Sequence, residues 1–261
     1  MRILHLTDPH MTAAGLNRFG VDPAEKLGET LEIADAAWPD IDVIAVSGDI
    51  ADDNDSQSYL RVREIVAEYA DKWGVSQCYC LGNHDIFTDW GAVFGSGILN
   101  ADGEDIGNGN DCGYSSAVID GWRFIVLDTH RDNQDPGFLD QAQAKWLKTL
   151  LSTPSEKGSV IVMHHPPVAL EANFDNNAGF TAKNELAQCL AGSDVKLILC
   201  GHLHRDFVGV FAGVTVVANG GTAGRLDYPQ HPANLAPEPG AAFAVVDLAG
   251  DFAPLTHIVR V

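Results

Sequence analysis

The run Asp42-Val43-Ile44-Ala45-Val46-Ser47-Gly48-Asp49 decides the fold class of this chain. A short continuous apolar stretch of this kind predicts a strand that is covered on both faces, as in parallel sheets. A helix is predicted before it, with Asp22 as N-cap and Pro23 at the first helical position. A second helical pattern, over residues 56–71, follows it. Strands that alternate with helices predict a layered α/β fold.

The same alternation extends outward along most of the chain. Further helices are predicted at 139–151 and 182–190, and further strands at 2–7, 77–81, 122–127, 159–163, 197–200, 214–218 and 241–246. From Phe207 onward, strand patterns follow one another without helices, which predicts that part of the sheet is antiparallel. Residues 220–240 are rich in Gly and Pro and predict a long loop. We interpret residues 1–261 as a single domain, since α/β architectures often reach this size.

The composition argues against several classes of partner. Asp and Glu number 36 against 16 Lys and Arg, a formal net charge of −20, so we expect no broad basic face for a nucleic-acid polymer or an anionic membrane. No apolar run approaches the roughly 18 residues of a membrane span, and no signal peptide is recognised, so we expect a cytoplasmic protein. The five cysteines form no C-x-x-C pair, which indicates reduced, structural thiols.

Polar residues of a few types stand at the ends of five predicted strands. The five motifs are Asp8-Pro9-His10, Gly48-Asp49-Ile50-Ala51-Asp52, Gly82-Asn83-His84-Asp85, His164-His165-Pro166-Pro167 and Gly201-His202-Leu203-His204. Ligands of open α/β sheets bind outside the carboxyl ends of the strands. Carboxylate, amide and imidazole groups together suit Mn, Fe, Zn or Co. The motifs therefore predict a metal site at one edge of the sheet.

Local spacing adds two expectations about this site. Asp8 and His10, two residues apart on an extended segment, are expected on the same side, where both reach one ion, and the same holds for His202 and His204. The glycines before Asp49, Asn83 and His202 allow a sharp turn or a close backbone approach where each strand delivers its ligand.

The ordered set D-P-H, G-D, G-N-H-D, H-H-P-P and G-H-L-H resembles the calcineurin-like metallophosphoesterase superfamily, from Asp8 to His204. This resemblance implies a four-layer α/β/β/α sandwich of two mixed sheets flanked by helices. The length, the G-D-I-A-D motif and the compact ending resemble the class III cyclic nucleotide phosphodiesterases and glycerophosphodiesterases. The implied reaction is hydrolysis of a small phosphodiester by a hydroxide that bridges two divalent or mixed-valence metal ions.

The resemblance also implies a role for each motif residue. The first metal ion would be held by Asp8, His10, Asp49 and His204. The second would be held by Asp49, Asn83, His164 and His202, with Asp49 bridging the two. The catalytic pair would be His84, which binds no metal, and Asp52, which orients His84 through a carboxylate–imidazole hydrogen bond.

Several alternatives stay open. A phosphomonoesterase or protein phosphatase would use the same metal site, and a non-catalytic metal-binding scaffold is the third class. The substrate would be selected by loops, and the candidates are residues 173–181 and residues 222–239, the latter with Arg225, Tyr228 and His231. The sequence does not decide whether His130 faces the pocket; for His165, as for His5 and His257, a structural role is favoured. The oligomeric state is also open, a homodimer included.

Overall fold

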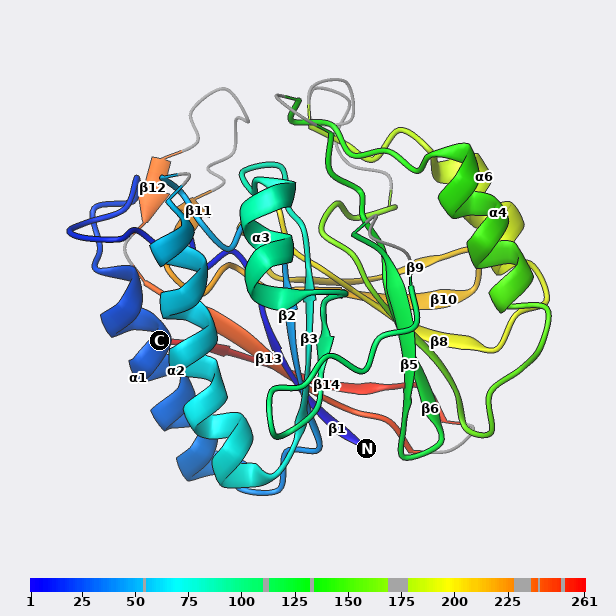
Figure 1. Ribbon diagram of the computed structural model, residues 1–261, viewed down its shortest axis with the longest axis horizontal. Helices are drawn as coiled ribbons and strands as arrows, with labels where there is room; N and C mark the ends of the chain where they lie inside the picture. Colours follow the sequence, from blue (N-terminus) through cyan, green and yellow to red (C-terminus); the bar gives the residue numbers. More distant parts are fainter. Residues whose placement is uncertain are drawn as a thin grey trace.

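The computed structural model describes residues 1–53, 55–109, 113–131, 134–168, 178–227, 236–238, 240–249 and 252–261. Within them, two six-stranded sheets lie face to face, with helices on both outer faces (Figure 1). Figure 1 shows the four layers from left to right as α1 and α2, the first sheet, the second sheet, and α4 and α6. This arrangement is the predicted four-layer sandwich.

The first sheet has the order β14-β13-β1-β2-β3-β4. Its centre is parallel and consists of β1 (Arg2–Leu6), β2 (Val43–Ser47) and β3 (Ser76–Cys80). Antiparallel strands complete it: β4 (Ile98–Leu99) beside β3, and β13 (Ala242–Asp247) and β14 (Leu255–Arg260) beyond β1. Its outer face is covered by α1 (Pro23–Ala37), α2 (Ser56–Trp73) and α3 (Phe87–Phe94).

The second sheet has the order β5-β6-β7-β8-β10-β9. Its parallel strands are β6 (Trp122–Val126), β7 (Gly158–Val162), β8 (Val195–Cys200) and β10 (Val214–Ala218). Antiparallel edges are formed by β5 (Ser115–Ile119) and β9 (Phe207–Phe211). Its outer face is covered by α4 (Gln141–Leu150) and α6 (Lys183–Leu190). The antiparallel strands β9, β13 and β14 confirm the prediction made for the chain beyond Phe207.

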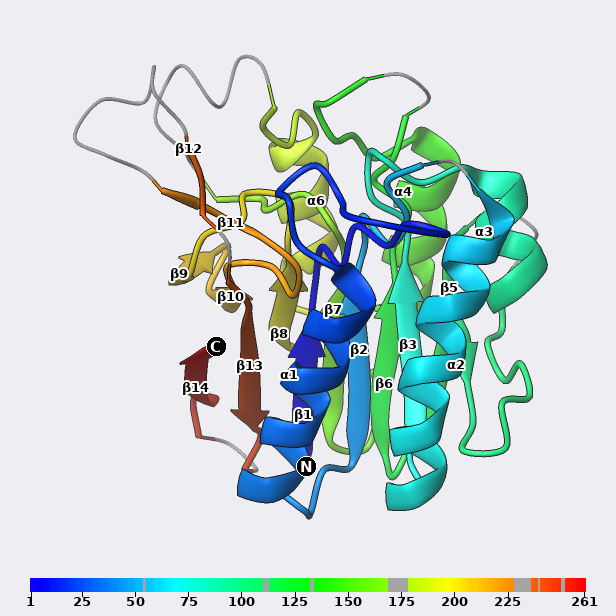
Figure 2. The same ribbon diagram turned by 90° about the vertical axis from the view of Figure 1, so that its left-hand side faces the viewer.

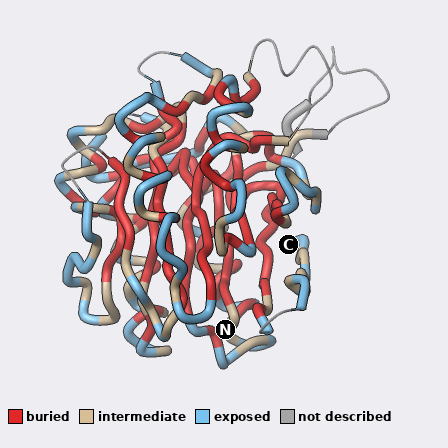
Figure 3. Tube along the Cα trace, turned by 90° about the vertical axis from the view of Figure 1, so that its right-hand side faces the viewer, coloured by how far each residue is buried: buried red, intermediate tan, exposed pale blue. Residues whose placement is uncertain are grey.

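Three hydrophobic clusters fill the interfaces between the four layers, and the central strands are buried along their length (Figure 3). Alternate residues of one strand serve different clusters: Val43 and Ala45 face the second sheet, whereas Ile44 and Val46 face the helices. Burial on both faces explains why the run is apolar without interruption. Four cysteines, Cys78, Cys80, Cys189 and Cys200, are buried and free, as predicted, while Cys112 lies outside the described residues.

Local signals explain which elements the sequence revealed. Asp22 caps α1 as predicted, because its side chain accepts hydrogen bonds from the backbone N–H groups of Ala24 and Glu25. The sequence did not indicate α3, which has no side-chain cap and contains a glycine. The prediction of a loop over 220–240 is wrong in part, because β11 (Arg225–Asp227) pairs with β12 (Ala236–Glu238).

The buried side chain of His5 gives a test of the core between the sheets. Its ring lies 2.8 Å from Ser47 Oγ through Nε2 and 3.3 Å from Asn219 Nδ2 through Nδ1, which supports the predicted structural role. Burial lowers the pKa of His5 from 6.5 to about 3. The neutral ring of the folded state must therefore gain a proton on unfolding below pH 6.5, and stability falls as the pH falls from 6.5 towards 3.

We expect the His5→Gln variant, which keeps one donor and one acceptor, to lose this dependence. In the metal-free protein, the free energy of unfolding of the wild type should fall between pH 6.5 and 4.5 more steeply than that of the variant, by about 1.4 kcal/mol per pH unit. Urea denaturation at a series of pH values measures both slopes. Equal slopes would show that His5 does not titrate with unfolding.

Candidate metal centre

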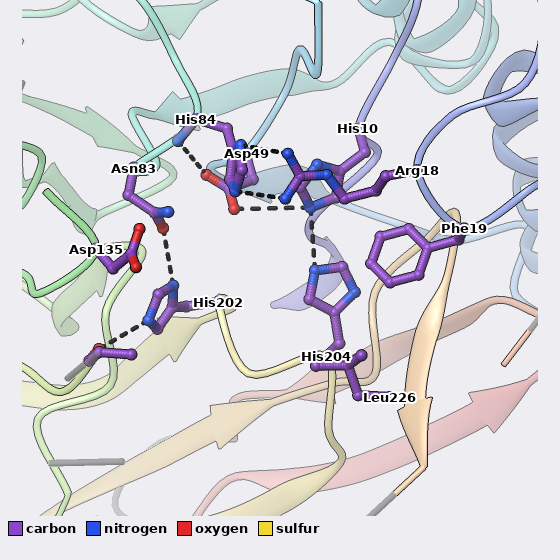
Figure 4. A pocket seen from close by; sticks show the side chains of 11 residues that line it. His10, Arg18, Phe19, Asp49, Asn83, His84, Asp135, His202, His204 and Leu226 are labelled. Atoms are coloured by element: carbon purple, nitrogen blue, oxygen red, sulfur yellow. Dashed lines mark hydrogen bonds and ion pairs between the residues drawn. The ribbon is translucent and has the colours of Figure 1, made fainter. Parts of the chain in front are cut away.

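The carboxyl ends of five strands meet at one edge of the sandwich. The strands β1, β2 and β3 of the first sheet end there, beside the ends of β7 and β8 of the second (Figure 2). Because the two sheets pack face to face, the loops that follow these strands bring the five motifs together (Figure 4). All seven predicted ligand side chains lie at this edge, in two groups that share Asp49.

The first group consists of Asp8, His10, His204 and Asp49. His204 Nε2 lies 3.4 Å from Asp8 Oδ1 and 3.0 Å from His10 Nε2. His10 Nε2 in turn lies 3.6 Å from Asp49 Oδ2. All four residues are buried, and the most exposed of them, His204, is only about 5% exposed.

The second group consists of Asp49, Asn83, His164 and His202. The same Asp49 Oδ2 atom lies 3.3 Å from His164 Nε2. Asn83 Oδ1 lies 3.2 Å from His164 Nε2 and 2.8 Å from His202 Nδ1. One carboxylate oxygen therefore faces both groups, which is the position of a bridging ligand.

The spacing of these atoms fits metal ligation. Ligands at about 2.0–2.2 Å from an ion, at tetrahedral or octahedral angles, stand roughly 3.0–3.5 Å apart. The distances between donor atoms within the two groups run from 2.8 to 3.6 Å, close to this range. The Nδ1 atoms of His10 and His204 both donate to oxygen acceptors, so the two Nε2 atoms present lone pairs to one another at 3.0 Å. A shared proton or a metal ion relieves that repulsion.

Each of the four histidines is held by its second ring nitrogen. His164 Nδ1 donates to the backbone oxygen of Ser47 and His204 Nδ1 to that of Gly224, both at 2.7 Å. His202 Nε2 donates to the backbone oxygen of Ala178 at 2.7 Å. Such partners fix the tautomer, so that the other nitrogen is available to a metal ion. The carboxylates also affect His164. Burial alone would lower the pKa of His164, but the charges of Asp49 and, to a smaller extent, Asp8 raise it to about 9.

The backbone at the ligands corrects one expectation. Asp8, His10, Asp49, His202 and His204 all have positive φ angles, between 43° and 72°, so these segments are not extended. His202 and His204 face different groups instead of one ion, whereas Asp8 and His10 lie in the same group as predicted. Left-handed backbone at non-glycine residues is strained and is concentrated at functional sites.

Two glycines show why the motifs need them. Gly48 has a φ of 87°, and a Cβ atom there would lie 2.6 Å from His164 Nδ1. A Cβ atom on Gly82 would lie 2.2 Å from the backbone nitrogen of Asp49. The predicted close approach of backbone and ligand is therefore present at both positions, and any side chain there would displace a ligand.

Asp52 does not make the predicted hydrogen bond to His84. Its Oδ1 atom lies 3.9 Å from His84 Nδ1, but 3.1 Å from His10 Nδ1 and 2.7 Å from Arg18 Nε. The carboxylate thus orients a ligand of the first group, and the guanidinium of Arg18 occupies the side that would face His84. Burial lowers the pKa of His84, with the charges of His10 and Arg18 in the same direction, so no imidazolium is favoured in the metal-free protein.

We therefore expect Asp52→Asn to weaken metal binding. An amide oxygen can still accept from His10 Nδ1 but carries no charge to raise the basicity of the ring. Loss of such an outer partner typically costs about 10–100-fold in metal affinity. Calorimetric titration of the metal-free variant with a divalent ion measures the change. Unchanged affinity for the ion would contradict a role through His10.

A cavity of about 390 Å³ opens over the two groups. Its wall includes His84, whose backbone N–H donates to Asp49 Oδ1 at 2.9 Å, and three residues that the sequence did not indicate: Arg18, Phe19 and Asp135 (Figure 4). Leu226, from the candidate loop 222–239, also lines it. The ring of Phe19 packs against those of His10 and His204, with centroids 5.5 and 4.7 Å apart. No spacing or motif marks Arg18, Phe19 or Asp135, since loops bring them to the cavity.

Comparison with known families identifies the family and supports the fold. The family model described as calcineurin-like phosphoesterase matches residues 1–206. The chain belongs to the calcineurin-like phosphoesterase family. The resemblance predicted from the five motifs is confirmed, and the protein is a phosphoric ester hydrolase.

Curated relatives of this phosphoesterase are similar over most of its length. A cAMP/cGMP dual specificity phosphodiesterase of Mycobacterium tuberculosis is 30% identical, over 85% of this chain and 72% of the relative. A 3′,5′-cyclic adenosine monophosphate phosphodiesterase of Escherichia coli is 28% identical, over 79% of this chain and 70% of the relative. Among solved structures, a dimetal phosphatase from Danio rerio has a TM-score of 0.64 at 16% identity and covers 98% of both chains, which confirms the fold.

Asp85 holds together the loops that carry two of the candidate ligands. The carboxylate of Asp85 accepts hydrogen bonds from the backbone N–H groups of Ile50, Ala51 and Gly82, at 2.8–3.1 Å, and so joins the loops that carry Asp49 and Asn83. Burial, together with the nearby charge of Asp49, raises the pKa of Asp85 to about 7. Although the residue stands in the third motif, no sequence feature predicts this role for it.

The other histidines named from the sequence either do not line the cavity or lie outside the described residues. Both ring nitrogens of His165 have partners, Thr129 Oγ1 at 2.8 Å and the backbone oxygen of Asp135 at 2.9 Å, which supports a structural role. His130 is buried beside Asp128 and is not among the residues that line the cavity. Residues 173–177, Tyr228 and His231 lie outside the described residues.

None of the described helices combines the length and the apolar character needed to cross a bilayer.

Proposed function

We propose that this phosphoesterase hydrolyses 3′,5′-cyclic nucleotides at a centre of two divalent metal ions. The observation that carries the proposal is the position of Asp49 Oδ2, which lies 3.6 Å from His10 Nε2 and 3.3 Å from His164 Nε2 and so faces both ligand groups. The choice of a cyclic nucleotide over other phosphate esters is supported by the names of the curated relatives in Mycobacterium tuberculosis and Escherichia coli.

The donor set supports two ions of the borderline divalent class, Mn, Fe, Zn or Co. Asp8, His10, Asp49 and His204 would hold one, and Asp49, Asn83, His164 and His202 the other. Oxygen and imidazole nitrogen donors without thiolate suit these metals. When bound, such a pair lowers the pKa of a water ligand towards about 7 and neutralises charge on the phosphoryl oxygens. That neutralisation is needed in a protein with a net charge of −20.

The side chain of His84 is proposed to donate a hydrogen bond, and then a proton, to the leaving oxygen of the ester. Because the neutral ring is favoured in the metal-free protein, this role requires that the ring take up a proton before the ester is cleaved. The backbone N–H of His84 is fixed to Asp49 Oδ1 at 2.9 Å, and the imidazole lines the cavity beside His10 of the first ligand group, with ring centroids 5.1 Å apart. A cyclic nucleotide leaves an alkoxide, which departs more readily when a donor supplies a proton. Asp52 is proposed to act as a positioning residue through His10, at 3.1 Å.

A substrate panel tests the proposal. Metal-free protein would be supplied with Mn, Fe, Zn or Co, and turnover would be measured on 3′,5′-cyclic AMP, a glycerophosphodiester and AMP. We expect the cyclic nucleotide to give the largest kcat/KM. A preference for AMP would instead place the protein among phosphomonoesterases, and a metal analysis that finds no bound ion would favour the non-catalytic scaffold. A cytoplasmic location and a homodimer stay predictions, which cell fractionation and gel filtration would test.

A further inference from the structure

Arg18 is held in one orientation at the cavity. It lies on the segment between β1 and α1, and its Nε atom donates to Asp52 Oδ1 at 2.7 Å, while its backbone N–H donates to Asp52 Oδ2 at 3.2 Å. The same segment is anchored by Asn17, whose Nδ2 donates to the backbone oxygen of Ala223 at 2.7 Å. The guanidinium is therefore pre-organised although its side chain is 46% exposed.

The terminal nitrogens of Arg18 have donor capacity that the protein does not use. Nη1 lies 3.0 Å from His84 Nε2, and Nη2 lies 3.2 Å from His84 Nδ1. A neutral imidazole has only one acceptor nitrogen, so it can accept from one of the two. Among the described residues the Nη atoms make no further hydrogen bond, and Figure 4 shows the guanidinium beside His84 at the cavity.

The charge of Arg18 is exceptional in this cavity. Among the described residues that line it, Arg18 alone is Lys or Arg, whereas Asp49 and Asp135 contribute carboxylates. The chain as a whole carries −20. An anionic ester that enters this field meets one fixed protein cation, placed next to His84. The planar fork of a guanidinium matches two oxygens of a phosphate group.

We propose that Arg18 contacts the substrate, with its Nη atoms donating to the non-bridging phosphoryl oxygens of the ester at the metal centre. This inference rests on the proposed function and adds a residue to substrate binding. It assigns Arg18 to the phosphate, which is common to all phosphodiesters, and not to the leaving group. Substitution should therefore affect a cyclic nucleotide and an activated diester equally, unlike substitution of His84.

Arg18→Ala and Arg18→Lys test the contact. We expect Arg18→Ala to raise KM about 10- to 100-fold for 3′,5′-cyclic AMP and for bis-p-nitrophenyl phosphate alike, the size of a lost hydrogen bond between charged groups, with a smaller change in kcat. Arg18→Lys keeps the charge without the fork and should lie between. Arg260→Ala is the matched control, because Arg260 Nε also pairs with a buried carboxylate, Asp206 Oδ2 at 2.6 Å, outside the cavity; it should change neither constant.

Binding of inorganic phosphate to the metal-loaded protein, measured by calorimetry, is a readout that does not depend on which ester is hydrolysed. Arg18→Ala should raise the Kd for phosphate by a factor similar to the rise in KM, with metal content and Tm unchanged. An unchanged Kd would overturn the inference, as would a loss of metal content in both variants, which would assign Arg18 a structural role through Asp52. A wild type that prefers AMP would refute the cyclic nucleotide proposal but leave the phosphate result to decide on Arg18.

Discussion

Asp49→Ala should lose both metal ions. The Asp49 Oδ2 atom lies 3.6 Å from His10 Nε2 and 3.3 Å from His164 Nε2, so one carboxylate serves each ligand group. Loss of a residue that only supports a ligand already costs about 10–100-fold in metal affinity, and loss of a shared ligand should cost more for each ion. We expect the purified variant to contain fewer than half of the wild-type metal equivalents by elemental analysis, and kcat/KM to fall with them.

Asp247→Ala is a suitable control for this variant. Asp247 also forms an ion pair, with Arg2 at 2.7 Å, but at the opposite end of β1 from the ligands. It should keep its metal content. An Asp49→Ala protein that retained two ions would contradict the bridging role, and one that retained a single ion would assign Asp49 to one group alone.

His84→Ala should slow the hydrolysis of a cyclic nucleotide while the metal content stays intact. Loss of a general acid typically costs about 10²–10⁴-fold in rate. The backbone N–H that binds Asp49 Oδ1 is kept in the variant, so the bridging ligand keeps this partner. A p-nitrophenyl diester leaves as a stable phenolate and needs less help from a donor, so its kcat should fall far less than that for 3′,5′-cyclic AMP.

Comparison of kcat on the two substrates measures this difference, and His257→Ala, an exposed histidine on β14, provides the control. Equal losses on both substrates would reject the proton donor and leave His84 as a contact to the phosphate. Loss of metal from His84→Ala would instead make it a ligand, in conflict with its position beside Arg18.

The fold was predictable because its strongest signals are local. The run from Val43 to Val46 is apolar because both faces of β2 are buried, and each of the five strands ends in a motif at the same edge. Parallel strands must bring those ends together, so the grouping of Asp8, Asn83 and His202 follows from the sheet. Weak local signals explain what was missed: α3 lacks a side-chain cap, and β11 and β12 have only three residues each.

The sequence predicted that the seven candidate side chains lie together, but not all of their contacts. A spacing of two residues predicts that His202 and His204 point the same way, but they face different groups, and their φ angles of 72° and 48° show that the segment is not extended. The family resemblance predicts a hydrogen bond between Asp52 and His84, but Asp52 Oδ1 lies nearer to His10 Nδ1 than to His84 Nδ1. Arg18 and Asp135 carry no motif, since their place in the cavity depends on how long-range contacts fold their loops.

Seven side chains are proposed to hold two metal ions, which the protein would use to hydrolyse a cyclic nucleotide. Titration of metal-free protein with Mn²⁺, with kcat/KM for 3′,5′-cyclic AMP measured at each addition, tests this proposal most directly. We predict that activity rises until two equivalents are bound and then stays constant. A plateau at one equivalent, or no hydrolysis at any metal content, would contradict the account.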